Sequence, residues 1–265
     1  MVEATLNYLA PMPERPAYYL SEPPPGTPWR NTKGDRRQLP IDDARTLTPA
    51  PSLEIEGFAL APLATAVDVR DTAALRERYY SEVERLVAQV TGATRVVAFD
   101  HNVRSATVSG RNAAGVQGPV RYAHNDYTER SAPQRVRDLL GAEAEGLLRR
   151  RFAVINVWKP IRGPVEGAPL AVCDARTIAP GDFIATDLRY ADRTGEVYSL
   201  RFNPSHRWFY FPRMEADEAM LLKCFDSDGG RARFTAHTAF DEPATRADAP
   251  PRESVEVRTL AFFAS

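Results

Sequence analysis

The spacing of apolar residues predicts two amphipathic helices in the first half of the chain. In the first, apolar side chains recur at three- and four-residue steps between a cap at Asp71 or Thr72 and a stop at Gly92. The second should have Ser131 as its cap and continue to Leu148, because the same period returns there. Each helix is therefore expected to pack an apolar stripe against a core.

From residue 151 onward the helical period gives way to short apolar runs bounded by turn residues, which are typical of β-strands. One strand is also expected earlier, over Arg95–Asp100, and a polar, glycine-containing loop over Ser105–Gly118. Strands at this spacing indicate a sandwich or barrel, so the fold should be mainly β with flanking helices. The predicted later strands are Phe152–Trp158, Leu170–Cys173, Asp182–Thr186, Glu196–Leu200, His206–Phe211, Ala219–Phe225, Arg233–Thr235 and Ser254–Phe263.

Residues 1–65 are expected to form an irregular N-terminal arm. Many of the 22 prolines fall in this segment, where they block helix propagation and keep the preceding residue extended. Short extended pieces are predicted at Thr5–Leu9 and Leu53–Phe58, and the arm could cover a substrate site. With helices over 66–150 and a β-rich core over 151–265, the chain is expected to be a single domain.

Charge and cysteine content narrow the classes of partner. Lys plus Arg total 34 against 35 Asp plus Glu, so a net charge of -1 gives no reason to expect binding to nucleic acid or an anionic membrane. No apolar run reaches the ~20 residues of a membrane span, and the N-terminus does not resemble a signal peptide. Cys173 and Cys224 lie in apolar runs, so buried reduced thiols and a cytoplasmic location are expected.

The candidate chemistry centres on His124 and Asp126. In an extended segment two residues that stand two positions apart leave the same face, so an imidazole and a carboxylate could hold adjacent positions on a divalent metal. A second histidine would complete the facial arrangement of two histidines and one carboxylate. His206 and His237 are both available in the β-rich half, and spacing alone does not choose between them.

The residues after the two histidines favour His237. A loop follows it and leads to Arg252 and Ser254, which share one face of the last predicted strand. A guanidinium fork and a hydroxyl placed in this way could together bind a carboxylate. His206 has no such pair downstream.

Taken together, these motifs resemble the iron(II)- and 2-oxoglutarate-dependent oxygenases. The chain is most similar to a branch of bacterial and fungal oxidoreductases that includes the gibberellin desaturase and proteins related to the J chain of cephamycin 7α-methoxylase. The stretches that carry the resemblance are Phe99–Arg104, His124–Thr128, Asn156–Pro160, Pro204–Arg213, Leu222–Ser227, His237–Asp241 and Pro250–Ser254.

The resemblance implies a double-stranded β-helix, the jelly-roll core also found in cupins. It implies that His124, Asp126 and His237 bind Fe(II), and that Arg252 and Ser254 bind the distal carboxylate of 2-oxoglutarate. With O2 as the other cosubstrate, a ferryl oxidant would abstract hydrogen from a C–H bond. The expected outcome is hydroxylation or desaturation of a small molecule, such as a secondary metabolite or carboxylic acid.

Other residues are weaker candidates for the same pocket. Asn156 and Tyr210 could contact the cosubstrate. The predicted substrate contacts are Arg104, Trp158, Arg213 and Tyr127. Each has a plainer interpretation, because aromatic residues are common in cores and arginines are often solvated or ion-paired.

Two other functions remain compatible with these residues. One is a cupin-like metalloenzyme, an isomerase or dioxygenase that needs no 2-oxoglutarate. The other is a β-sandwich binding module with a vestigial metal site. Release of succinate that depends on 2-oxoglutarate would separate the oxygenase from both.

Overall fold

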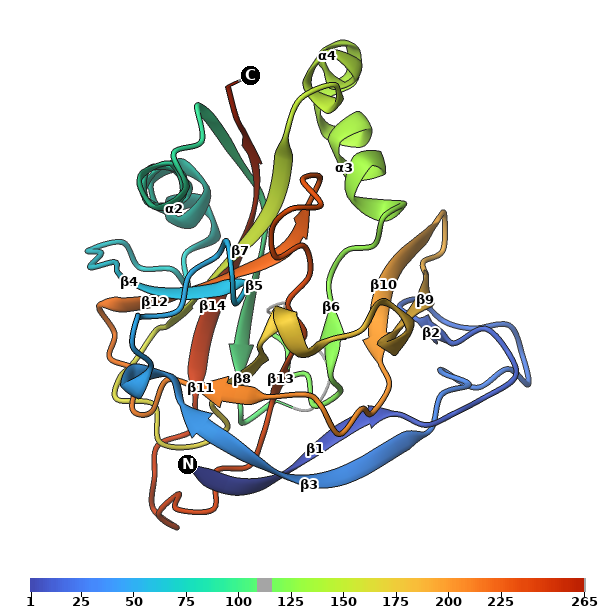
Figure 1. Cartoon of the computed structure of the whole chain (residues 1–265), viewed down its shortest axis with the longest axis vertical. Coiled ribbons are helices and arrows are strands. Elements are labelled where there is room, and N and C mark those ends of the chain that lie inside the picture. Colours follow the sequence, from blue (N-terminus) through green and yellow to red (C-terminus); the bar gives the residue numbers. More distant parts are fainter. Residues whose placement is uncertain (109–115, 265) are drawn as a thin grey trace.

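The structure is a computed structural model that describes residues 1–108 and 116–264. Its strands form two curled sheets that face each other and build the double-stranded β-helix (Figure 1). The nine-stranded sheet has the order β1 (Val2–Leu9), β3 (Gly34–Asp43), β11 (Trp208–Tyr210), β8 (Leu170–Cys173), β13 (His237–Ala239), β6 (His124–Asn125), β10 (Thr194–Leu200), β9 (Phe183–Arg189) and β2 (Ala17–Tyr19). The five-stranded sheet has the order β4 (Phe58–Pro62), β12 (Glu218–Asp226), β7 (Phe152–Pro160), β14 (Glu253–Phe262) and β5 (Arg95–Ser105).

Strand β7 lies at the centre of the five-stranded sheet and is buried along its whole length. Val154 and Trp158 on one face pack in the core between the sheets. Ile155 and Val157 on the other face pack under the first helical segment. Because both faces are covered, the sequence of β7 is a nearly continuous apolar run.

The first predicted helix is confirmed. It consists of α1 (Thr72–Ala74), a π-helical segment η2 (Leu75–Tyr79) and α2 (Tyr80–Thr91). The Asp71 carboxylate accepts hydrogen bonds from the Ala73 and Ala74 amides, so Asp71 is the N-cap. Gly92 ends the helix with a left-handed φ of 72°.

The second helix is interrupted, contrary to the prediction of one continuous helix. It divides into α3 (Ser131–Leu140), η3 (Gly141–Glu143) and α4 (Ala144–Leu148), because Gly141 adopts φ 49° and ψ −119°. The cap also differs from the prediction. The Thr128 hydroxyl oxygen accepts from the Arg130 and Ser131 amides, at 3.2 and 3.0 Å, while Ser131 is itself helical.

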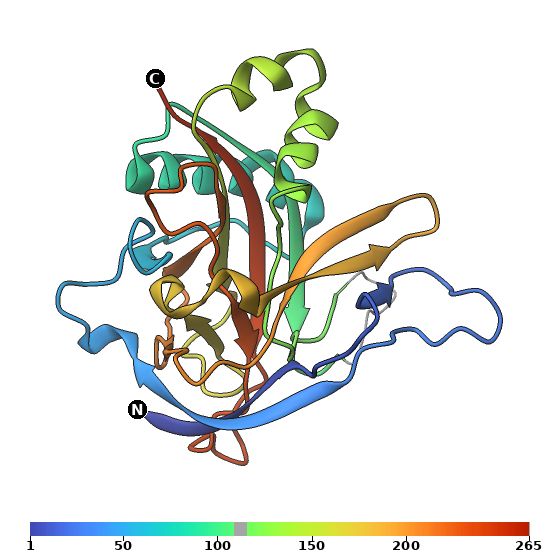
Figure 2. The same ribbon diagram turned by 45° about the vertical axis from the view of Figure 1, so that its right-hand side comes forward.

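The N-terminal arm is more regular than predicted. Strands β1 and β3 pair antiparallel without interruption from Val2↔Ile41 to Leu9↔Gly34 and extend the nine-stranded sheet. Leu6 and Tyr8 on alternate positions of β1 are buried, which explains the pairing. The β9–β10 hairpin and the loop after β2 project on one side of the molecule (Figure 2).

Strand limits shift at several other places. β8 has the predicted limits, whereas β5 continues five residues beyond Asp100 to Ser105. The predicted Arg233–Thr235 strand is not formed, and β13 begins instead at His237. β4 starts at Phe58, where the predicted extended piece ended. The polar loop predicted over 105–118 lies partly outside the described residues.

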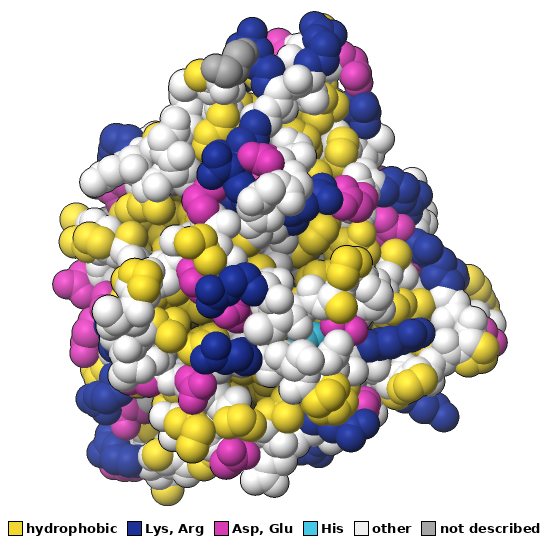
Figure 3. All heavy atoms as spheres, in the orientation of Figure 1, with side chains coloured by type: hydrophobic (Ala, Val, Ile, Leu, Met, Phe, Trp, Pro, Cys, Tyr) yellow, Lys and Arg dark blue, Asp and Glu magenta, His cyan; other side chains and the backbone are white. Residues whose placement is uncertain are grey.

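The compositional predictions concern burial, membrane spans and charge. Both cysteines are buried and unbridged, as predicted. Among the helices described, none is long and apolar enough to cross a membrane. On the face shown in Figure 3, basic and acidic side chains are intermixed.

Candidate metal centre and cosubstrate pocket

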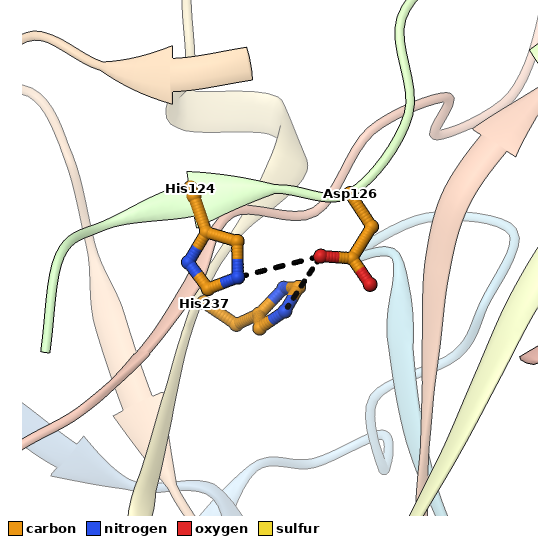
Figure 4. Close-up of side chains that lie close together, drawn as sticks. All are labelled: His124, Asp126 and His237. Carbon is orange, nitrogen blue, oxygen red and sulfur yellow. Dashed lines mark ion pairs between the residues drawn. The ribbon is translucent and has the colours of Figure 1, made fainter. Parts of the chain in front are cut away.

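Two histidines and one aspartate converge between the sheets. β6 and β13 are neighbours, and His124 lies directly opposite His237 in their pairing, so the imidazole centroids are 4.4 Å apart. Asp126 follows immediately after β6 and turns its carboxylate toward both rings (Figure 4). One donor atom from each of the three residues lies within 4.8 Å of the others, a spacing that can hold one metal ion.

Backbone carbonyl oxygens orient both imidazoles. The Nδ1 of His124 lies 2.8 Å from the carbonyl oxygen of Tyr122, and the Nδ1 of His237 lies 3.2 Å from that of Thr235. In both cases Nδ1–H donates and Nε2 keeps a free lone pair directed at the centre. Burial, followed by the neighbouring imidazole, lowers the pKa of His237 to about 4, which keeps this ring neutral.

The Asp126 carboxylate is kept ionised. Burial alone would raise its pKa, but Arg258 and the two imidazoles outweigh burial and hold the pKa well below its usual range. Arg258 Nε donates to Asp126 Oδ2 at 2.9 Å, and Asn156 Nδ2 donates to the same oxygen at 2.8 Å. A charged carboxylate with one oxygen facing two imidazole rings is a suitable donor set for a divalent transition metal.

A pocket opens over the three side chains, and its wall includes Arg104, Trp158, Arg252 and Glu256. Arg252 is 4% exposed and its guanidinium lies over the Trp158 ring, 5.5 Å from the centroid. Burial, and then the positive charges of Arg104 and Arg121, lower the pKa of Arg252 to about 9. The unpaired charge of Arg252 is therefore costly where it lies, and an anion beside its guanidinium would be favourable.

Two buried donors in this region have no acceptor within the described part of the chain. Arg252 Nη1 donates to the Ala168 carbonyl at 2.8 Å, but Arg252 Nε has no partner. Ser254, 1% exposed and two residues along β14, also has an unsatisfied hydroxyl. Unsatisfied buried donors cost free energy, so a pair of them beside a metal-type donor set indicates a place for an anionic ligand.

A buried amide connects the two ligand-bearing segments. Asn125 is fully buried between the ligand residues, and its Nδ2 donates to the Tyr127 and Cys224 carbonyls at 2.7 and 2.8 Å. Its Oδ1 accepts from the Thr235 amide at 3.3 Å. The Thr235 hydroxyl donates in turn to the Gly57 carbonyl at 2.8 Å, which ties the segment before β13 to the start of β4.

We expect Gly57→Ala to lower both stability and metal affinity. Gly57 has φ 85°, and an added Cβ would lie 2.1 Å from the Thr235 hydroxyl oxygen. Left-handed strain and overpacking each cost about 1–3 kcal/mol. The displaced Thr235 also carries the carbonyl that orients His237. Chemical denaturation and an anaerobic Fe(II) titration measure the two effects.

Gly92→Ala is the matched control for Gly57→Ala. Its φ of 72° is similar, but nothing lies within 4 Å of the added Cβ, so only the backbone strain remains. The control should lose a smaller amount of stability and none of its metal affinity. Equal losses in the two variants would contradict the role of the Thr235 contact.

The remaining histidines lie outside the cluster. His206 Nε2 is 3.1 Å from Asp182 Oδ2, and its ring stacks on Tyr8. His101 Nδ1 is 2.8 Å from the Tyr80 hydroxyl. Each of these rings is engaged in a separate polar contact, which leaves His237 as the histidine that meets the first two ligands.

Among the other predicted contacts, Arg104 and Trp158 lie in the pocket wall. Asn156 holds the Asp126 carboxylate. Tyr127 is buried in the core between the sheets, whereas Tyr210 packs edge-to-face on Phe240 in a different core cluster. Neither tyrosine belongs to the pocket wall as far as the structure describes it, and nor does Arg213, which is exposed after β11.

Sequence reasoning missed Arg258 and Glu256. Both continue the strand face that begins with Arg252 and Ser254, and they alternate along β14 with the apolar residues Val255 and Val257. A polar residue at every second position of an otherwise apolar strand was the available signal.

Comparison with known proteins places this geometry in a family. A family model described as an oxidoreductase/YMDC permease-like domain matches residues 6–262. The chain is 36% identical over 254 residues to the Fe(II)/2-oxoglutarate-dependent dioxygenase nvfI of Aspergillus novofumigatus, covering 92% of this chain and 90% of that protein. The chain belongs to the iron(II)- and 2-oxoglutarate-dependent oxygenases.

Further relatives agree with this membership. The hydroxylase/desaturase efuI of Hormonema carpetanum is 31% identical over 286 residues, covering 99% of this chain and 95% of that protein. A solved structure of the iron and alpha-ketoglutarate-dependent endoperoxidase NvfI superposes with a TM-score of 0.90 at 33% identity, covering 100% of this oxygenase and 98% of that chain. The predicted family, fold and enzymatic class are confirmed, and the relatives favour the oxygenase over the two alternative functions.

Proposed function

We propose that this oxygenase binds Fe(II) through His124, Asp126 and His237 and uses 2-oxoglutarate and O2 to oxidise a small molecule. The observation that carries the proposal is the combination of two sites in one pocket. Three metal-type donors and Arg252 line this pocket, and among the described residues the buried Arg252 Nε and the hydroxyl of Ser254, two positions further along the chain, have no hydrogen-bond partner. A dicarboxylate that spans the two would satisfy both.

The residues present fit the implied metal. Two imidazoles and one ionised carboxylate bind ferrous iron well and would occupy one side of it, which leaves positions for other ligands. His124 Nε2 and His237 Nε2 lie 3.4 and 4.0 Å from Asp126 Oδ1, so these three atoms would hold the ion. When bound, iron with its two cosubstrates supplies oxidation of an unactivated C–H bond, with succinate and carbon dioxide as co-products.

The protein would hold and orient the cosubstrate. Arg252 would bind the distal carboxylate through its free Nε–H, and Ser254 would add a hydroxyl donor from the same strand face. Charge-assisted hydrogen bonds in a buried pocket are strong and geometrically specific. Trp158 lies against the guanidinium and would shield this ion pair from water.

The substrate would enter over the same pocket wall. Arg104 and Trp158 are the predicted substrate contacts that line it, and an arginine there favours a substrate with a carboxylate or another acceptor group. Relatives described as hydroxylase/desaturase support hydroxylation or desaturation of a secondary metabolite. Contacts from Arg213, Tyr127 and Tyr210, and a single-domain organisation, stay predictions.

Release of succinate provides the test. We expect purified protein loaded anaerobically with Fe(II) to form succinate from 2-oxoglutarate when O2 and a carboxylic-acid substrate are added. A metalloenzyme of the cupin type would convert its substrate without 2-oxoglutarate, and a binding module would form no succinate. Asp126→Asn is the negative control, because an amide is a poor replacement for the anionic ligand.

A further inference from the structure

The two oxygens of the Asp126 carboxylate have different surroundings. Oδ1 faces both imidazoles, at 3.4 and 4.0 Å, and Oδ2 points away from them (Figure 4). Oδ2 accepts two hydrogen bonds, from Asn156 Nδ2 at 2.8 Å and from Arg258 Nε at 2.9 Å. Both donors come from the five-stranded sheet, whereas Asp126 belongs to the segment that follows β6 in the opposite sheet.

Arg258 is fixed on its other sides as well. Its Nη1 donates to Asp100 Oδ2 at 3.1 Å, and its Nη2 lies 3.1 Å from Glu256 Oε1. The carboxylates of Asp126, Asp100 and Glu256 therefore all contact one guanidinium. The Arg258 side chain is nearly buried, at 13% exposed. A planar fork with several fixed donors can serve all three at once, which the single point charge of a lysine cannot do.

We propose that Arg258 and Asn156 are positioning residues that hold Asp126 Oδ2 away from the metal, so that the carboxylate presents Oδ1 alone. A carboxylate whose two oxygens are both available can bind a cation through both of them. In this site a second Asp126 oxygen would take a position that the cosubstrates need. This inference rests on the proposed iron site and assigns the residues that keep one side of it open.

A positioning role for Arg258 and a role in charge neutralisation alone predict different results. If Arg258 only balanced buried carboxylates, its replacement would lower stability and leave the 2-oxoglutarate affinity of the metal-loaded protein unchanged. If it positions Oδ2, replacement frees that oxygen to bind the metal beside Oδ1, so the metal-saturated protein should bind 2-oxoglutarate more weakly. Outer hydrogen-bond partners of metal ligands are typically worth about 10- to 100-fold in affinity or activity.

Asn156→Leu is the cleaner of two test variants. Asn156 is fully buried and its Oδ1 has no hydrogen-bond partner in the described structure, so leucine, which has the same branched shape, removes the donor to Asp126 and no other hydrogen bond. Arg258→Lys keeps the charge and removes the fork. The matched control is Arg151→Lys. Arg151 is also largely buried, at 19% exposed, and is also paired with more than one carboxylate, here Asp226 and Glu54.

The measurement is an anaerobic titration of the metal-free variants with Fe(II), followed by titration of the loaded protein with 2-oxoglutarate. Thermal unfolding of the metal-free proteins reports stability separately. We expect both site variants still to bind Fe(II) and, once loaded, to bind 2-oxoglutarate about 10- to 100-fold more weakly than wild type. Arg151→Lys should change only the unfolding temperature.

A wild-type 2-oxoglutarate affinity in folded, Fe(II)-loaded Asn156→Leu would overturn the proposal, even if Arg258→Lys failed to fold. Failure of the underlying function gives a different result. In that case wild-type protein itself would not bind Fe(II), or would bind it equally well after replacement of His237. If His237→Ala lost the Fe(II) binding of the wild type while Fe(II)-loaded Asn156→Leu kept the wild-type 2-oxoglutarate affinity, only the positioning role would be rejected.

Discussion

Replacement of His237 by alanine should abolish specific Fe(II) binding and all turnover. His237 supplies one of three proposed ligands, so its loss should exceed the about 100-fold effect of losing an outer hydrogen-bond partner. The fold should persist, because β13 keeps its backbone pairing with β8 and β6. The stability cost should stay near that of one lost buried hydrogen bond and a small cavity, about 2–4 kcal/mol. An anaerobic Fe(II) titration with circular dichroism measures both.

His206→Ala is the matched control for this prediction. His206 is also buried and hydrogen-bonded, to Asp182 and Tyr8, and the order of residues along the chain did not by itself exclude it as the third ligand. Its loss should lower the unfolding temperature and leave one Fe(II) per chain. If His237→Ala retained Fe(II) and His206→Ala lost it, the ligand assignment would be wrong.

The local part of the site could be read from the sequence. His124 and Asp126 stand two residues apart, so any extended backbone puts them on one face. Arg252 and Ser254 share a face of β14 for the same reason. The link between these two pairs is a tertiary contact, which spacing cannot reveal. The resemblance to a known family supplied that link, and the structure brings His237 beside His124.

The support around the site could not be read in this way. Arg258 reaches Asp126 from 132 residues away, across the gap between the two sheets. Which charged residues of β14 face inward depends on its register with β7, and which of them meet Asp126 depends on how the sheets pack. The contact of Thr235 with Gly57 spans 178 residues and is equally non-local.

The fold shows the same division between local and non-local information. The first helix and most strands follow from periodicity, since each buries a face defined by its own residues. Pairing of β1 with β3 was missed because a proline-rich segment separates the two strands, and proline content obscured the alternation that buries Leu6 and Tyr8. The break at Gly141 depends on a backbone conformation that apolar spacing does not encode.

Replacement of Arg252 by leucine should raise the KM for 2-oxoglutarate about 30-fold or more and leave Fe(II) affinity close to that of wild type. Truncation of one partner of a buried, hydrogen-bonded charge pair costs about 2–5 kcal/mol, and each 1.4 kcal/mol is a factor of ten. Ser254→Ala should have a smaller effect, because one neutral hydrogen bond is worth about 1 kcal/mol. Succinate formation against 2-oxoglutarate concentration gives both values.

The metal-free proteins provide an independent readout of the same prediction. Burial lowers the pKa of Arg252, which means that its charge is costly to the folded protein until an anion joins it. Arg252→Leu should therefore unfold at the wild-type temperature or above it, and 2-oxoglutarate should no longer raise that temperature. Arg246→Ala, which removes an exposed arginine paired with Glu166, should keep the wild-type KM and thermal shift. An undiminished thermal shift in Arg252→Leu would mean that a different cation holds the distal carboxylate, and Arg104, which also lines the pocket, would be the candidate.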